Sequence, residues 1–63
     1  MKFTLTLSLD NADAQYEDGS LNEQALAGYL EQAAGKVRDY ETRSASIRDG
    51  NGNTIGEYAV SDD

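Results

Sequence analysis

The 63-residue chain contains no cysteine and no histidine. Without cysteine it can form neither a disulfide nor a thiolate metal site. Without histidine it lacks the commonest general base and the commonest transition-metal ligand. A domain this small is also too thin to enclose a pocket that would tune paired carboxylates. We therefore expect no enzyme activity, no cofactor and no metal.

Long apolar runs and basic residues are scarce as well. No apolar run approaches the roughly 20 residues that span a bilayer, and residues 1–8 alternate too strictly for the core of a signal peptide. Twelve acidic residues stand against five basic ones, for a net charge of −7. This balance argues against direct binding to nucleic acid or to an anionic membrane.

Large aliphatic residues and phenylalanine are few, but their spacing indicates one folded domain over residues 1–63. Period-two alternation predicts a strand over residues 2–10, with polar residues on its other face. Its expected inward side chains are Phe3, Leu5, Leu7 and Leu9. A sheet packed on one face only is typically antiparallel.

Two more strands are expected around a turn at residues 49–53, whose Gly, Asn and Asp suit positive-φ positions. Residues 42–48 alternate, with Ala45 and Ile47 facing inward. Residues 54–60 form the return strand.

The return strand needs an irregularity, because Ile55 and Tyr58 are three residues apart and cannot share a face of a regular strand. We expect a bulge near Gly56 to bring both inward. Residues 61–63 are expected to form a frayed acidic tail.

A helix is predicted from a capping box, with Ser20 as N-cap and Glu23 at the third helical position, to about Tyr40. Its expected buried stripe contains Leu26, Tyr29, Leu30, Ala33, Val37 and Tyr40. Gly28 and Gly35 fall on the opposite face. They are either tolerated weak helix formers or a place where a partner approaches closely.

These elements predict an α+β fold of order β-α-β-β, with one helix on one face of a three-stranded, mostly antiparallel sheet. We expect the last strand in the centre of the sheet. The alternative places the first strand there.

Residues 11–19 show no period and predict a loop with an unusual run of acids. Tyr16 lies in its middle. One interpretation is a solvated connector with Tyr16 packed against the core. The other is a binding site with Tyr16 as aromatic anchor, a residue type enriched in binding hot spots.

Net negative charge is concentrated in the first half, where residues 1–35 carry six of the twelve acids against Lys2 alone. A compact acidic surface resembles the charge of a DNA backbone, so a basic DNA-binding groove would attract it. Carboxylates would then stand where phosphates stand. The predicted partner-binding residues are Asp10, Asp13, Tyr16, Glu17, Asp18, Glu31 and Asp39. Alternatively, the acidity only keeps a small domain soluble.

The strand that opens at residues 1–5, the acidic loop, the single helix and the hairpin at residues 48–58 resemble small acidic proteins of phages and mobile elements. Within that group the chain is similar to anti-CRISPR proteins, in particular to inhibitors of type I-C CRISPR. The resemblance implies that it blocks a DNA-binding surface of the Cascade complex in the cytoplasm of an infected bacterium. No family motif carries over residue by residue, so the site rests on charge position.

A second hypothesis is a structural or assembly module that pairs through its sheet edge or hairpin. In that case Arg43, Arg48 and residues 51–53 would matter more than the loop. A monomer and a weak homodimer both remain open.

Overall fold

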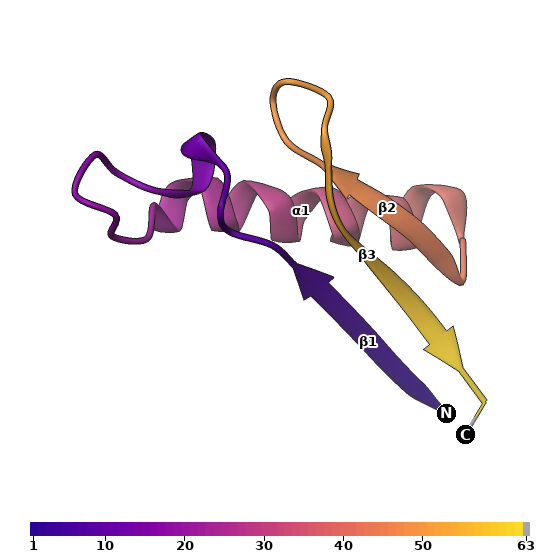
Figure 1. The fold of residues 1–63 in the computed structure, drawn as a ribbon. Helices are drawn as coiled ribbons and strands as arrows, with labels where there is room; N and C mark the ends of the chain where they lie inside the picture. The colour runs from indigo at the N-terminus through magenta and orange to yellow at the C-terminus, as the bar shows by residue number, and fades with distance from the viewer. Residues whose placement is uncertain (63) are drawn as a thin grey trace.

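The computed structural model describes residues 1–62 and confirms the α+β fold (Figure 1). Its elements are β1 (Lys2–Leu7), the 3-10 helix η1 (Ala12–Ala14), α1 (Glu23–Tyr40), β2 (Ser44–Arg48) and β3 (Thr54–Ser61). The molecule is elongated, with extents of 40 × 23 × 17 Å. One end holds the loop between β1 and α1, and the other holds both termini.

The sheet has the order β1-β3-β2, and both strand pairs are antiparallel. The prediction of a central last strand is confirmed, and the alternative with the first strand in the centre is wrong. Tyr58 pairs with Leu5 on one side and with Ala45 on the other. Its ring therefore sits in the middle of the sheet, where it is almost fully buried.

The predicted bulge near Gly56 is confirmed. Ile47 pairs with Gly56, but the next residue of β2 pairs with Thr54, so Ile55 is skipped. As a result Ile55 and Tyr58 are both buried. Gly56 is required there, because a Cβ would overlap the main-chain oxygen of Thr6 on the neighbouring strand β1.

The helix begins later than predicted. Asn22, not Ser20, is the N-cap, and its side-chain oxygen accepts from the amides of Gln24 at 3.1 Å and Ala25 at 3.3 Å. The hydroxyl of Ser20 instead donates to Asp18 at 2.6 Å. Asparagine and serine cap helices about equally well. Because the Ser20 hydroxyl is already bonded to Asp18, Asn22 takes the capping position. At the other end Glu41 adopts a left-handed conformation with φ 52°.

The first strand ends at Leu7 rather than at residue 10, so its ladder with β3 stops at the pair of Leu7 and Gly56. The amide of Ser8 still donates to the carbonyl of Ile55 at 2.7 Å. The frayed tail is wrong for residues 61 and 62: Ser61 belongs to β3, and Asp62 accepts from an arginine. Asp63, the rest of that predicted tail, lies outside the described residues.

The core is small and is centred on β2 and β3. Its buried hydrophobic members are Ala14, Tyr29, Ala33, Ile47, Ile55 and Tyr58. The hydroxyls of Tyr58 and Thr42 share a hydrogen bond, and the ring of Phe3 lies 5.5 Å from that of Tyr58.

The helix is displaced towards β2, so half of the predicted buried stripe is exposed. Leu30, Val37 and Tyr40 are 46%, 42% and 72% exposed, whereas Tyr29 and Ala33 are buried. Figure 1 shows α1 crossing the strands obliquely, and its closest packing in the sheet is with β2. A single helix placed this way cannot also cover β1.

Candidate functional site

The segment between β1 and α1 is tied to the rest of the fold, and it is more structured than the predicted loop. Residues 12–14 form η1, and Ala14 is fully buried in the core. The carbonyl of Ala14 accepts from the amide of Asn22 at 2.8 Å, and Gln15 and Leu21 form an isolated antiparallel bridge. Residues 11–21 therefore form a narrow loop that leaves the end of β1 and returns to the start of α1, and we call this loop the excursion.

A turn forms the tip of this excursion. The amide of Tyr16 donates to the carbonyl of Ser20 at 2.8 Å, and the amide of Gly19, whose φ is +86°, donates to Tyr16 at 2.9 Å. Glu17 and Asp18 are the central residues of this turn, and both are exposed. The Tyr16 side chain is 50% exposed. The interpretation that packs Tyr16 against the core is therefore wrong.

Asp18 has a structural role within the turn besides its charge. Its carboxylate accepts from the hydroxyl of Ser20 at 2.6 Å and from the Ser20 amide at 2.9 Å. These hydrogen bonds, the hydroxyl first, lower the pKa of Asp18 below its usual value. Asp18 is therefore ionised at neutral pH, and its position is set by the turn.

The hairpin turn between β2 and β3 lies beside η1. The Asp13 carboxylate is 3.5 Å from the position that a Cβ on Gly50 would take. The Asn11 amide donates to the hydroxyl of Tyr29 at 3.0 Å and fastens the start of the excursion to α1. The hairpin turn and η1 are thus neighbours in space.

Asp49 organises the hairpin turn and was missed as a structural residue. Its carboxylate accepts from the amides of Asn53 at 2.9 Å and Asn51 at 3.0 Å. The Asn53 amide is the main reason that the pKa of Asp49 is lowered. The signal was present in the sequence, because an aspartate ahead of Gly and Asn commonly bonds its own turn.

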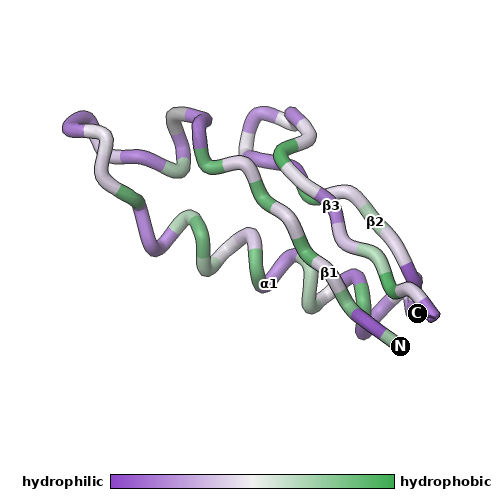
Figure 2. The backbone as a smooth tube through the Cα atoms, turned by 60° about the horizontal axis from the view of Figure 1, so that its bottom comes forward, coloured by the Kyte–Doolittle hydropathy of each residue, from purple (hydrophilic) through white to green (hydrophobic). Residues whose placement is uncertain are grey.

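We call the cluster of carboxylates around the excursion the acidic end, defined by Asp10, Asp13, Glu17, Asp18 and Glu23. No lysine or arginine occurs anywhere in residues 3–35. In residues 1–62 the two ion pairs are Arg38–Asp39 at 3.0 Å and Arg43–Asp62 at 2.7 Å, both at the opposite end. Figure 2 shows that the excursion and the neighbouring hairpin turn are mainly hydrophilic.

The structure brings only part of the predicted site together. Four predicted acids and Tyr16 belong to the excursion or lie just before it. Glu31 and Asp39 are about 12 and 24 Å further along α1 than Glu23, at the rise of an α-helix. Asp39 is also paired with Arg38. Neither residue belongs to the acidic end.

The two edges of the sheet differ. The outer edge of β2 is covered by α1: Gln32 bonds both the amide and the carbonyl of Arg48 at 2.9 Å, and Lys36 donates to the carbonyl of Ser46 at 2.6 Å. In the described part of the chain no side-chain hydrogen bond reaches the main chain of β1.

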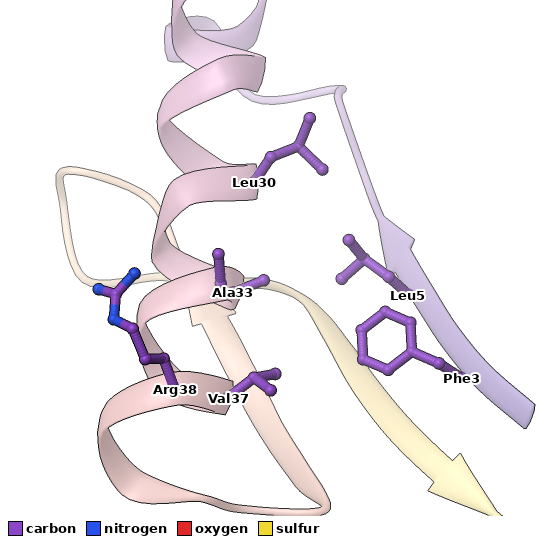
Figure 3. A pocket seen from close by; sticks show the side chains of 7 residues that line it. Phe3, Leu5, Leu30, Ala33, Val37 and Arg38 are labelled. Atoms are coloured by element: carbon purple, nitrogen blue, oxygen red, sulfur yellow. The ribbon is translucent and has the colours of Figure 1, made fainter.

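An apolar groove of about 420 Å³ lies between β1 and α1 (Figure 3). It is lined by Phe3, Leu5, Leu30, Ala33, Ala34, Val37 and Arg38. The figure shows Phe3 and Leu5 on β1 facing Leu30 and Val37 across it. The sequence pattern marked these side chains as apolar but placed them in the core, so the groove was missed.

Within the described range of 1–62, no group of three or more acidic side chains is arranged to hold a metal ion. No helix formed by these residues is long and apolar enough to cross a membrane. Comparison of the chain with protein-family models, curated proteins and solved structures found no significant match. The resemblance to anti-CRISPR proteins therefore stays a prediction.

Proposed function

We propose that the protein binds a basic protein surface through its acidic end and competes there with DNA. The observation that supports this most is the separation of charge: the carboxylates of the acidic end lie in a stretch without any basic residue, while the ion pairs of residues 1–62 lie at the other end. Unpaired carboxylates keep their full attraction for a basic groove.

The turn at the tip of the excursion supplies the other requirements of a contact site. Asp18 is held in place by Ser20, and Glu17 beside it has no hydrogen bond to give up within residues 1–62. Tyr16 adds an exposed aromatic side chain of low flexibility, as interface hot spots commonly do. We propose that these groups replace DNA phosphates on the partner.

The proposed partner is a DNA-binding surface of the type I-C Cascade complex, in keeping with the resemblance to anti-CRISPR inhibitors. The place of action would be the cytoplasm of an infected bacterium. Neither catalysis nor a cofactor is needed, because occupying the surface is sufficient to exclude DNA.

The test is a DNA-binding competition with purified type I-C Cascade and a labelled target duplex. The variant Asp13→Lys/Glu17→Lys reverses two charges of the acidic end that make no side-chain hydrogen bond among residues 1–62. The matched control, Glu41→Lys/Glu57→Lys, makes the same change of charge elsewhere. We expect the first variant to inhibit DNA binding at least about tenfold less well than the wild type, and the control variant to inhibit about as well as the wild type. The difference between the first variant and the wild type should become smaller in high salt, because salt screens the charges.

Equal inhibition by the wild type and both variants would contradict the proposed site. Failure of the wild type to displace DNA at any concentration would contradict Cascade as the partner. Circular dichroism of both variants shows whether the fold is retained.

A further inference from the structure

The exposed edge of β1 is competent to pair with another strand. Hydrogen bonds alternate along an antiparallel pair, and the amide of Ser8 donates to β3. The main chains of Thr4 and Thr6 therefore also face β3, and those of Phe3, Leu5 and Leu7 face outward. Three consecutive outward residues offer both donors and acceptors along a regular strand.

Nothing in β1 protects this edge in the usual ways. The strand contains no proline and no bulge, and its register with β3 is uninterrupted from Lys2 to Leu7. Lys2, at its start, is its only charged residue. Natural proteins usually protect an edge with charges, proline, a bulge or a covering element, and β2 has such a cover in Gln32 and Lys36.

The apolar groove beside this edge is also uncovered. Phe3 is 51% exposed, and Leu30 and Val37 are nearly as exposed. No acidic residue lines the groove, and the charge of Arg38 is balanced by Asp39. In a protein of net charge −7, the groove is a surface that two copies can share without facing carboxylates.

We propose that two copies pair through β1, antiparallel, to form one continuous six-stranded sheet with both helices on the same face. In such a pair the outward residues of one β1 must lie opposite the outward residues of the other. A two-fold axis at Leu5 brings all three outward residues, Phe3, Leu5 and Leu7, opposite outward residues of the second copy. Phe3 then opposes Leu7 of the second copy, and Leu5 opposes its own equivalent. This register allows about six main-chain hydrogen bonds across the new pair.

Side chains and charges agree with this register. The two copies of Phe3, Leu5 and Leu7 form one apolar strip between the helices, which covers the half of each sheet that α1 leaves open. Lys2 opposes Ser8 of the second copy, beside its Asp10, so charges of opposite sign approach. Antiparallel pairing also places the two acidic ends at opposite ends of the dimer. A second copy is a suitable partner for this surface because its own β1 edge and apolar groove are uncovered in the same way.

The proposal is independent of the partner proposed above, and its test is the concentration dependence of the mass by sedimentation equilibrium in 0.15 and 0.5 M salt. We expect a monomer–dimer equilibrium in the micromolar range, which tightens with salt as repulsion between the two negative copies is screened. A chain synthesised with an N-methyl group on Leu5 loses one outward donor and gains a steric block. The matched control carries N-methyl on Ser46, an outward residue of β2.

The Leu5 modification is expected to raise the dissociation constant by about tenfold or more, and the Ser46 modification to leave it unchanged. Leu30→Glu, which puts a charge into the groove, is expected to act like the former, and Gly28→Glu, which puts the same charge on the opposite face of α1, like the latter. A monomer up to about 1 mM would overturn the proposal. A dimer whose dissociation constant is unchanged by both the Leu5 modification and Leu30→Glu would also overturn it. A dimer that the Ser46 modification weakens as much as the Leu5 modification does would overturn it as well. Circular dichroism confirms the fold of each chain.

Discussion

The two edge strands of this sheet differ in how the single helix covers them: side chains of α1 bond the main chain of β2 but leave β1 uncovered. Over β2, Gln32 and Lys36 reach down from α1 and bond the outward main chain. Over β1, the same helix leaves Phe3 and Leu5 beside an open groove. One helix can cover about half of a three-stranded sheet, so its lateral position decides which edge is closed to association and which edge remains available.

The largest effect is expected from Gly56→Ala, which acts on the β1 side of the comparison. A Cβ there overlaps the main chain of Thr6 and lies 2.8 Å from Leu7 Cδ2, so β1 must shift away from β3. Overpacking against backbone costs about 3 kcal/mol. Urea unfolding would show this loss, and a free energy of unfolding within error of the wild type would contradict the close approach of β1 to Gly56.

A smaller effect is expected from Gln32→Ala, which opens the β2 edge. Both hydrogen bonds to Arg48 are lost, at about 0.5–1 kcal/mol each for exposed bonds. Gln24→Ala is the control, because this exposed side chain on the same helix makes no hydrogen bond among residues 1–62. If both variants unfold at the same urea concentration, Gln32 does not stabilise the edge.

Gly28→Ala should act on neither edge and should stabilise the protein slightly. Apart from the adjacent residues and the backbone of the helix itself, no atom lies within 4 Å of the added methyl group, and alanine is favoured over glycine within a helix by about 0.5–1 kcal/mol. An increased melting temperature is expected. Unchanged inhibition of Cascade would favour simple tolerance of glycine over close approach of a partner at this position.

The smallest effect is expected from a fall in pH, and it acts through the hairpin turn that joins β2 to β3. Hydrogen bonds lower the pKa of Asp49 and that of Asp18 in the folded protein. Each carboxylate therefore contributes stability that is present above its unfolded pKa of about 4 and is lost as the pH falls through the lower folded value. Asp49→Asn should flatten this loss in unfolding curves below pH 4. An acid dependence identical to that of the wild type would contradict the role of Asp49.

Sequence patterns predicted the features that depend on near neighbours. Alternation identified the strands, and the three-residue spacing of Ile55 and Tyr58 required the bulge at Gly56. The cap was misplaced because Ser20 and Asn22 both suit that role. Only the competing bond from Ser20 to Asp18 decides between them.

Features that depend on the placement of α1 were not predictable. Apolar periodicity marks Leu30 and Val37 as a face, but it does not say how wide a sheet will cover that face. Gln32 and Lys36 look like ordinary solvent-facing residues until β2 is placed beneath them. Likewise, Asp39 was included in the predicted site because a count of charges contains no distances.

Hydrogen exchange of individual main-chain amides tests the difference between the edges most directly. In dilute solution the Leu5 amide should exchange quickly, whereas the Arg48 amide, bonded to Gln32, and the inward Thr6 amide should be protected. In concentrated solution Leu5 should gain protection as β1 pairs. Slow exchange of Leu5 in the dilute sample, or exchange that does not change with concentration, would contradict an open edge that pairs two copies.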